Sequence, residues 1–184
     1  MTPPSAPPPF VVVTGGPGAG KSTLLEALAT AGCATVAEAG RAIIQDQTLI
    51  GGRALHTADT VLYAELMLSW EMRSHREAAA LPGPVFFDRG VPDLVGYHLL
   101  LGRDVPEHVT TAARLFRYQP VVFVAPPWPD IYAHDEERKQ DFAEAVRTHD
   151  AVVEGYRRHG YDLVALPKAD VAARVDFVLD RLGG

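Results

Sequence analysis

A glycine-rich loop between a strand pattern and a helix pattern constrains the fold of this chain more than any other feature. Residues 10–14 (FVVVT) form an apolar run typical of a short buried strand, and residues 21–31 (KSTLLEALATA) have helical spacing. Between them, residues 15–22 read GGPGAGKS and match the pattern G-x-x-x-x-G-K-[ST] completely. Glycines allow successive backbone N–H groups to point inward, and the helix N-terminus adds a partial positive charge. The segment therefore predicts a phosphate-binding loop.

The residue types of this loop predict that its ligand is a nucleoside triphosphate with Mg²⁺. The Lys21 ammonium is expected to reach the β- and γ-phosphates, and the Ser22 hydroxyl is expected to coordinate the metal. A glycine-rich strand-to-helix turn without a ligand is the structural alternative. The expected phosphate contacts are Gly15, Gly16, Pro17, Gly18, Ala19, Gly20, Lys21, Ser22 and Thr23.

Strand and helix patterns alternate along the rest of the chain. Apolar strand patterns cover residues 10–14, 34–37, 85–88, 121–124 and 163–166, and helical patterns cover 21–31, 39–47, 57–80, 92–101, 106–117, 141–159 and 170–182. Such alternation is typical of parallel βαβ units. We therefore expect an α/β fold, a three-layer domain over residues 10–184, preceded by a flexible proline-rich tail at residues 1–9.

The charge and composition of the chain exclude several classes of protein. With 23 acidic against 17 basic residues, the net charge of −6 argues against a general nucleic-acid binder. The single cysteine, Cys33, excludes an internal disulfide framework, and the histidines show no spacing typical of a structural metal site. The most apolar stretch, residues 61–72, contains Glu65 and Glu71 and is too short to span a membrane. Since the N-terminus also lacks a secretory signal, we expect a cytoplasmic protein.

An acidic residue ends the third strand pattern. Asp88 follows the apolar run 85–87, and in a parallel sheet this places one carboxylate at the carboxyl edge, beside the phosphate-binding loop. We interpret Asp88 as a Walker B acid that serves as general base or as Mg²⁺ ligand. The alternative is that Asp88 caps the next helix and that Arg89 is solvated.

Two charged residues follow the second strand pattern, at the same expected edge of the sheet. From there, Glu38 and Arg41 are expected to bind the hydroxyl or phosphate of a substrate. The alternative is an ordinary surface helix in which Glu38 lies near the positive end of the helix dipole.

The segment 126–141 is rich first in proline and then in charge, and it lacks a clear apolar face. Arg138 and Lys139 within it are expected to lie over a transferring phosphoryl group as part of a lid, because lid closure excludes water. An ordinary exposed helix is the alternative. Residues 168–170 (KAD) are similar to the guanine-binding pattern N-K-x-D, but Pro167 replaces the asparagine, so we expect ATP rather than GTP. Asp170 is more simply the N-cap of the last helix.

Four motifs together resemble a known family: residues 12–22, 38–41 (EAGR), 86–90 (FFDRG) and 125–128 (APPW). The chain resembles the small bacterial AAA-labelled predicted ATPases of the P-loop kinase type over residues 10–182. It is also similar to nicotinamide riboside kinases and, more distantly, to deoxynucleoside and thymidylate kinases.

This resemblance implies a five-stranded parallel sheet, nucleoside/nucleotide-kinase-like, with the third strand beside the first. It also implies that Asp88 lies next to the P-loop, that Glu38 and Arg41 face the acceptor, and that Arg138 belongs to the lid. Two departures are visible. Asp88 is followed by Arg-Gly, where nicotinamide riboside kinases carry a second acid two residues on, and the chain has no sensor motif of ring-forming AAA machines.

The function expected from these residues is that of a small-molecule kinase. ATP·Mg²⁺ would donate its γ-phosphoryl to a nucleoside, a nucleotide or a related acceptor, with Lys21, Arg89 and Arg138 stabilising the transferred charge. A nucleotide-binding regulatory ATPase or switch without an acceptor is the alternative, and a hydrolase acting on the nucleotide is a third. Arg89, rather than a glutamine or glutamate, follows Asp88 and favours the kinase.

The helical pattern at 57–80 is the longest in the chain. Apolar residues lie on nearly all sides of its first half, which is therefore expected to be buried. This helix is also a candidate packing surface for a homodimer, although the sequence leaves the oligomeric state open.

Overall fold

The computed structural model describes residues 9–132 and 142–183. The predicted tail therefore lies outside the described residues apart from Pro9, and so do Arg138 and Lys139 of the predicted lid. The elements of the described ranges are β1 (Phe10–Gly15), α1 (Lys21–Thr30), β2 (Ala34–Val36), α2 (Ala39–Ile50), α3 (Thr60–Ala78), β3 (Val85–Asp88), α4 (Val91–Leu100), α5 (Glu107–Leu115), β4 (Val121–Ala125), the 3₁₀ turn η1 (Pro129–Ile131), α6 (Phe142–Arg157), β5 (Asp162–Ala165) and α7 (Val171–Arg181).

The five strands form one parallel sheet in the order β2-β3-β1-β4-β5. β3 pairs directly with β1, and Val13 is the register partner of Asp88. This adjacency carries the acid at the end of β3 to the strand that leads into the phosphate-binding loop. The expected α/β fold, the parallel sheet and the neighbouring first and third strands are confirmed.

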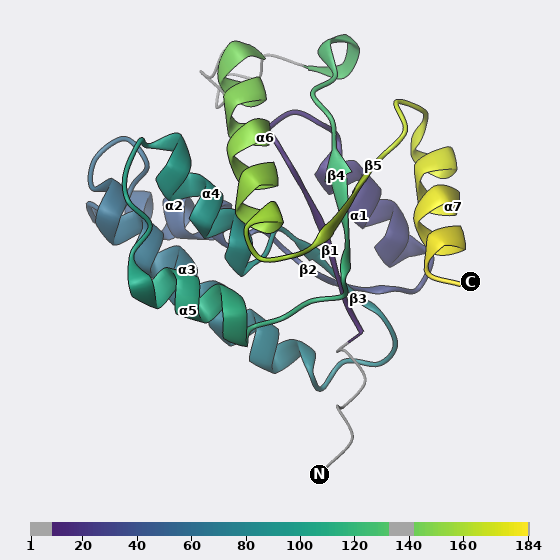
Figure 1. The fold of residues 1–184 in the computed structure, drawn as a ribbon, viewed down its shortest axis with the longest axis horizontal. Helices are drawn as coiled ribbons and strands as arrows, with labels where there is room; N and C mark the ends of the chain where they lie inside the picture. The colour runs from purple at the N-terminus through teal and green to yellow at the C-terminus, as the bar shows by residue number, and fades with distance from the viewer. Residues whose placement is uncertain (1–8, 133–141, 184) are drawn as a thin grey trace.

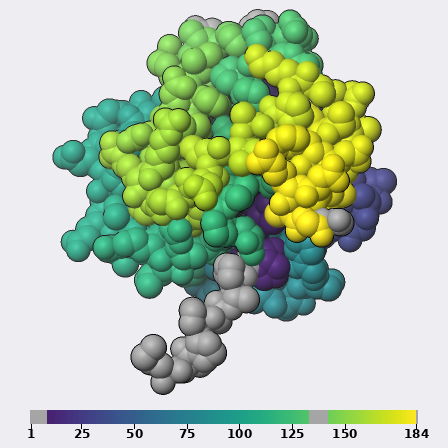
Figure 2. Space-filling view, turned by 45° about the vertical axis from the view of Figure 1, so that its right-hand side comes forward, coloured from purple at the N-terminus to yellow at the C-terminus, as the bar shows by residue number. Residues whose placement is uncertain are grey.

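Helices cover both faces of the sheet, which gives three layers (Figure 1). β1 alternates between the two faces, because Val11 and Val13 pack toward α1 and α7 while Phe10 and Val12 pack toward the opposite helices. All four side chains are at most 3% exposed. Burial of one such side chain contributes about 1.5–3 kcal/mol, so this strand stabilises both cores at once. In the space-filling view, only a small purple area near the N-terminus is visible between the flanking elements (Figure 2).

The long helix differs from its prediction in both extent and burial. α3 begins at Thr60, because the side chain of Asp59 accepts a hydrogen bond from Leu62 N at 3.0 Å and acts as N-cap. The expectation that its first half is buried on all sides is wrong, since Val61 is 53% exposed. Only one stripe of α3 faces the core, as for an ordinary surface helix.

Two further expectations concern the helices. The predicted N-cap of the last helix is confirmed, because Asp170 accepts from Ala173 N at 2.9 Å. Among the helices of the described ranges, none is long and apolar enough to cross a bilayer.

Candidate nucleotide and acceptor site

The loop between β1 and α1 turns through two left-handed glycines. Gly18 has a φ of 70° and Gly20 a φ of 75°, conformations that a side chain would strain. Gly20 is also the residue from which α1 starts. The backbone N–H groups of Gly18, Ala19 and Gly20 donate to no other residue in the described part of the chain. The loop thus presents free donors at a helix N-terminus, which is the arrangement that binds phosphate oxygens.

Lys21 opens α1, and its side chain folds back over the loop. Its Nζ donates to the carbonyl of Gly16 at 2.9 Å, and the residue is 6% exposed. Burial lowers the pKa of Lys21 to about 8, with a smaller contribution from the positive charge of Arg89. A phosphate group would therefore find a desolvated ammonium, whose charged form it would stabilise.

Asp88 is the last residue of β3 and is 6% exposed. Its Oδ1 atom is buried and lacks a hydrogen-bond partner in the described part of the chain. Burial raises the pKa of Asp88, and the nearby Lys21 ammonium opposes that shift. The alternative that Asp88 caps the next helix does not hold, because α4 starts from Gly90, whose N–H donates to Asp93 Oδ2 at 2.9 Å.

Arg89 is held by three acceptors and is not solvated. Its Nε donates to Glu38 Oε1 at 2.9 Å, and its Nη1 donates to the Gly15 carbonyl at 3.0 Å and to Asp93 Oδ1 at 3.3 Å. The backbone of Arg89 has a φ of 73°, an αL conformation rare for a residue with a side chain. Its Nη2 forms no hydrogen bond to a described residue, and Arg89 lines the adjoining cavity.

Glu38 lies immediately before α2, as its N-cap residue, but its side chain makes no capping bond. The Glu38 carboxylate instead forms the ion pair with Arg89. Burial opposes the charge of this carboxylate, but Arg89 outweighs that effect and lowers the pKa of Glu38. Arg41, on the first turn of α2, is exposed and forms no hydrogen bond or ion pair with another described residue, so its guanidinium is free toward the cavity that it lines.

Asp93 is a site residue that sequence analysis missed. It lies in the first turn of α4, is 7% exposed, and accepts from Thr14 Oγ1 and from Tyr156 OH at 2.5 Å each. With its contacts to Gly90 and Arg89, this carboxylate joins β1, the β3–α4 turn and α6. Asp93 thereby fixes the position of the Arg89 guanidinium.

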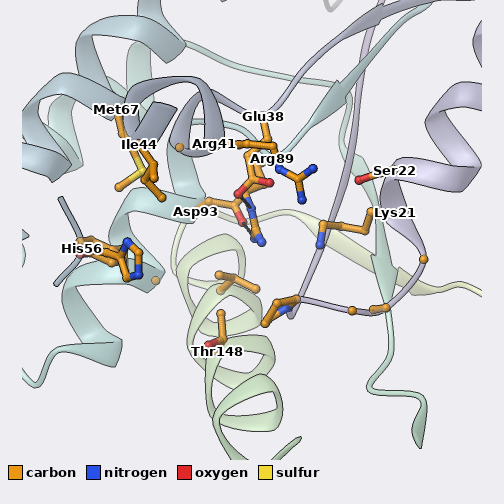
Figure 3. Close-up of a pocket in the computed structure, with 18 of the residues that line it drawn as sticks. Lys21, Ser22, Glu38, Arg41, Ile44, His56, Met67, Arg89, Asp93 and Thr148 are labelled. Atoms are coloured by element: carbon orange, nitrogen blue, oxygen red, sulfur yellow. Dashed lines mark hydrogen bonds and ion pairs between the residues drawn. The ribbon is translucent and has the colours of Figure 1, made fainter. Parts of the chain in front are cut away.

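These residues surround a cavity of about 1350 Å³ that extends from the loop to α2, α3 and α4. In Figure 3, Lys21 and Ser22 lie on one side, Glu38, Arg89 and Asp93 in the middle, and Ile44, Met67 and His56 on the other side. The far end is aromatic as well as polar, since Tyr63 and Tyr97 meet edge to face with centroids 5.8 Å apart. Asp88 itself is not among the lining residues.

A second residue that sequence analysis missed lines the far end. Glu71 on α3 is 5% exposed and follows Tyr63 and Met67 at helical spacing, so all three line the cavity from one face of α3. Burial raises the pKa of Glu71 to about 8. The signal in the sequence was an acid within an otherwise apolar helical pattern.

The opposite end of the cavity is lined by residues of α7 and of the segment after β4. Arg174 donates from Nη1 to the Ala19 carbonyl at 3.2 Å and from Nε to the Pro167 carbonyl at 3.1 Å. Its guanidinium lies 5.5 Å from the ring centre of Trp128, and its Nη2 is buried without a partner in the described ranges. Arg174, also missed in the sequence, therefore ties α7 to the phosphate-binding loop.

The donor set fits Mg²⁺. Asp88 Oδ1, which has no partner in the described ranges, and the Ser22 hydroxyl are hard oxygen donors on β3 and α1, two elements in contact with each other. Among the described residues, no three or more histidine, cysteine or acidic side chains are arranged so that they could hold a metal ion by themselves. Such a sparse set suits a magnesium ion that is bound chiefly through nucleotide phosphates and water.

The comparisons with known proteins agree with this geometry. Residues 10–174 match a family model described as an AAA domain. Among curated proteins, no sequence matches the chain. Similar solved structures include a deoxyadenosine kinase from M. mycoides, with 15% identity, a TM-score of 0.67 and coverage of 95% of this chain and 98% of that one.

Two further structures have the same fold. A thymidylate kinase from Ehrlichia chaffeensis has 14% identity and a TM-score of 0.64, with 94% of this chain and 97% of that chain covered. A NadR protein in complex with NR has 20% identity and a TM-score of 0.67, and the match covers 94% of this chain but 50% of that one. At identities this low, the structural similarity shows a shared fold alone.

Proposed function

This chain belongs to the AAA domain family and has the fold of nucleoside and nucleotide kinases, and on that premise we propose that it is an ATP·Mg²⁺-dependent phosphotransferase acting on a small molecule. The acceptor would be a nucleoside, a nucleotide or a related compound.

The continuity of the cavity is the observation that carries this proposal. One space joins the free amides of the phosphate-binding loop to a second end lined by Glu38, Arg41 and the tyrosine pair. An enzyme that only hydrolyses its nucleotide needs room for water at the γ-phosphate. Here the room beyond the loop is large enough for a second organic molecule, whose binding would orient it toward the phosphate.

The roles of the residues follow from their positions. The loop amides and Lys21 would neutralise the phosphates, and the free Nη2 of Arg89 would stabilise charge on the transferred group. Glu38, oriented by Arg89, would accept a hydrogen bond from the acceptor, and Arg41 would contact it from the rim of the cavity. Arg174 and Trp128 would border the donor's base at the other end. When bound, Mg²⁺ would supply charge neutralisation of the phosphates, held by Ser22 and Asp88.

Asp88 would be the proton acceptor or the metal ligand of the reaction. Its pKa is raised by burial, which is the direction that makes a carboxylate a better base. Arg138 would complete the phosphoryl site from the predicted lid.

An acceptor screen tests this proposal. ADP formation from ATP would be measured with nucleosides, nucleoside monophosphates and vitamin-like alcohols, each against an acceptor-free control. The kinase is supported by a compound that raises turnover well above hydrolysis and appears phosphorylated by mass spectrometry. Steady hydrolysis that no compound stimulates would instead favour the regulatory ATPase.

A further inference from the structure

Glu71 is a buried acid without a hydrogen-bond or ion-pair partner in the described part of the chain. The residue is 5% exposed and lines the cavity, and its carboxyl forms neither a hydrogen bond nor an ion pair with any residue in the described ranges. Buried carboxyl groups normally have such partners. A buried polar group left without partners at a cavity wall is accounted for when a ligand completes its hydrogen bonds.

The charges around Glu71 disfavour a carboxylate there. Three acids face it, namely Asp93 on α4, Glu38 before α2 and Asp88 at the end of β3. Arg89 is the cation that acts on Glu71 most strongly, and its guanidinium is already bonded to Glu38 and Asp93, while the Lys21 ammonium interacts with the same three acids. Ionisation of Glu71 would add a further negative charge to a cluster in which three acids already share these two cations.

The uncharged neighbours of Glu71 provide no positive charge that would stabilise its carboxylate form. Tyr118, before β4, is buried near Glu71 and itself has a strongly raised pKa, so it carries no charge at neutral pH. Tyr63 and Met67 lie on the same face of α3 and provide an aromatic ring and a thioether. The surroundings therefore favour an uncharged carboxylic acid.

We propose that Glu71 is a specificity-determining residue of the acceptor end, which binds the acceptor as a neutral carboxylic acid. Its O–H donates to a lone pair on an uncharged oxygen or nitrogen of the acceptor, such as a hydroxyl, a carbonyl or a ring nitrogen, and its C=O is free to accept from a neighbouring N–H or O–H. This inference rests on the proposed phosphotransferase activity and adds the chemistry by which its acceptor is recognised.

The neutral and the ionised form of Glu71 would favour different acceptors at this position. A carboxylate would select a cationic acceptor through an ion pair, and replacing it with an amide would destroy that pair. A neutral acid offers one donor and one acceptor, which glutamine reproduces in nearly the same shape. The comparison of Glu71→Gln with Glu71→Leu therefore separates the two states.

The experiment has two steps. Wild-type protein is first screened for acceptor-dependent ADP formation with the common ribonucleosides, deoxyribonucleosides and their 5′-monophosphates. With the best acceptor, kcat and both KM values are then measured for wild type, Glu71→Gln, Glu71→Leu and the control Glu65→Gln. Glu65 is on the same helix and pairs with the exposed His108. Thermal unfolding checks that each variant folds.

The expected result is a KM difference confined to the acceptor. Glu71→Gln should keep the acceptor KM within about 3-fold of wild type, whereas Glu71→Leu should raise it by about 10-fold or more with the ATP KM unchanged. Equal loss in both variants would show that the charge is required and would overturn the proposal, as would unchanged KM in both. If no compound stimulates wild-type turnover, the proposed activity itself fails at the first step, and the acceptor contact of Glu71 falls with it.

Discussion

The guanidinium of Arg89 and the carboxylate of Glu38 meet at 2.9 Å across 51 positions of sequence, at the floor of the cavity. Arg89 reaches this position from an αL backbone with a φ of 73°, a conformation that costs a residue with a side chain on the order of 1–2 kcal/mol. The ion pair and the bonds to Gly15 and Asp93 hold it there. A residue kept in a strained conformation by several contacts is typical of a functional site.

Breaking this pair should destabilise the protein and remove activity together. We expect Arg89→Ala to lower the free energy of unfolding by about 2–3 kcal/mol, because it leaves Glu38 and Asp93 without their cation. A double-mutant cycle with Glu38→Gln, measured by urea unfolding, should give a coupling of about 1–2 kcal/mol.

The exposed pair Arg73–Glu77 is the matched control for that measurement. Its two side chains are 69% and 62% exposed, and exposed i,i+4 pairs are worth only about 0.3–0.5 kcal/mol. If Arg89→Ala cost no more than Arg73→Ala, the proposed role of Arg89 as the organiser of the cavity floor would be wrong.

Replacing Asp88 should separate turnover from binding. Asp88→Asn keeps the size of a side chain whose Oδ1 has no partner in the described chain, so the fold should tolerate it. We expect kcat to fall by about 10²–10⁴-fold, the usual contribution of a general base, while the nucleotide Kd changes by less than about 3-fold. Steady-state kinetics and calorimetric titration measure the two quantities.

An exposed acid on α2 controls for a general loss of negative charge in the Asp88 experiment. Asp46→Asn should leave both kcat and Kd at their wild-type values. Parallel loss of binding and turnover in Asp88→Asn would mean that Asp88 supports the architecture of the site and takes no part in the chemistry.

The buried ammonium of Lys21 should make nucleotide binding depend on pH. Its pKa is lowered to about 8, so the free protein loses this charge as the pH rises through 8, and a bound triphosphate should restore it. Nucleotide affinity should thus weaken by up to about 10-fold per pH unit above 8, with proton uptake on binding. Titration calorimetry in buffers of different ionisation enthalpy detects that uptake.

The pH effect should be specific to this lysine. Lys21→Met should bind nucleotide weakly at every pH and without proton uptake near pH 8, whereas Glu71→Gln should keep the uptake. Proton release on binding, or an affinity independent of pH between 7 and 9.5, would contradict the assignment of Lys21 to the phosphates.

Local patterns were enough to predict the sheet and the phosphate-binding loop. The loop is one continuous segment, residues 15–22, so all the glycines, the lysine and the serine of the motif are close together in the sequence. The position of Asp88 could be predicted because the last residues of all parallel strands lie at the carboxyl edge of the sheet. The order of strands came from a family resemblance, since apolar runs such as 10–14 and 121–124 do not by themselves indicate which neighbours pair.

Residues whose roles depend on distant partners could not be predicted. Asp93 contacts Thr14 and Tyr156, which are 79 and 63 positions away, and its sequence context is that of an ordinary helix start. Arg174 reaches Ala19 across 155 positions. Neither residue has a local pattern that distinguishes it from a surface charge, because the orientation of α4 and α7 is decided by packing.

Glu71 should make the stability of the folded protein decrease as the pH rises. Its pKa is about 8 in the folded state and near the ordinary glutamate value of 4.5 when unfolded. Between these values the folded chain holds one proton more than the unfolded chain, so unfolding releases a proton and is favoured by rising pH. Relative to pH 5, this residue should lower the free energy of unfolding of wild type by about 3–4 kcal/mol at pH 8. Glu71→Gln should lack that component, and Glu65→Gln should keep it. Urea unfolding at pH 5, 6.5 and 8 measures the difference, and parallel pH curves for wild type and Glu71→Gln would show that Glu71 is ionised in the folded protein at neutral pH.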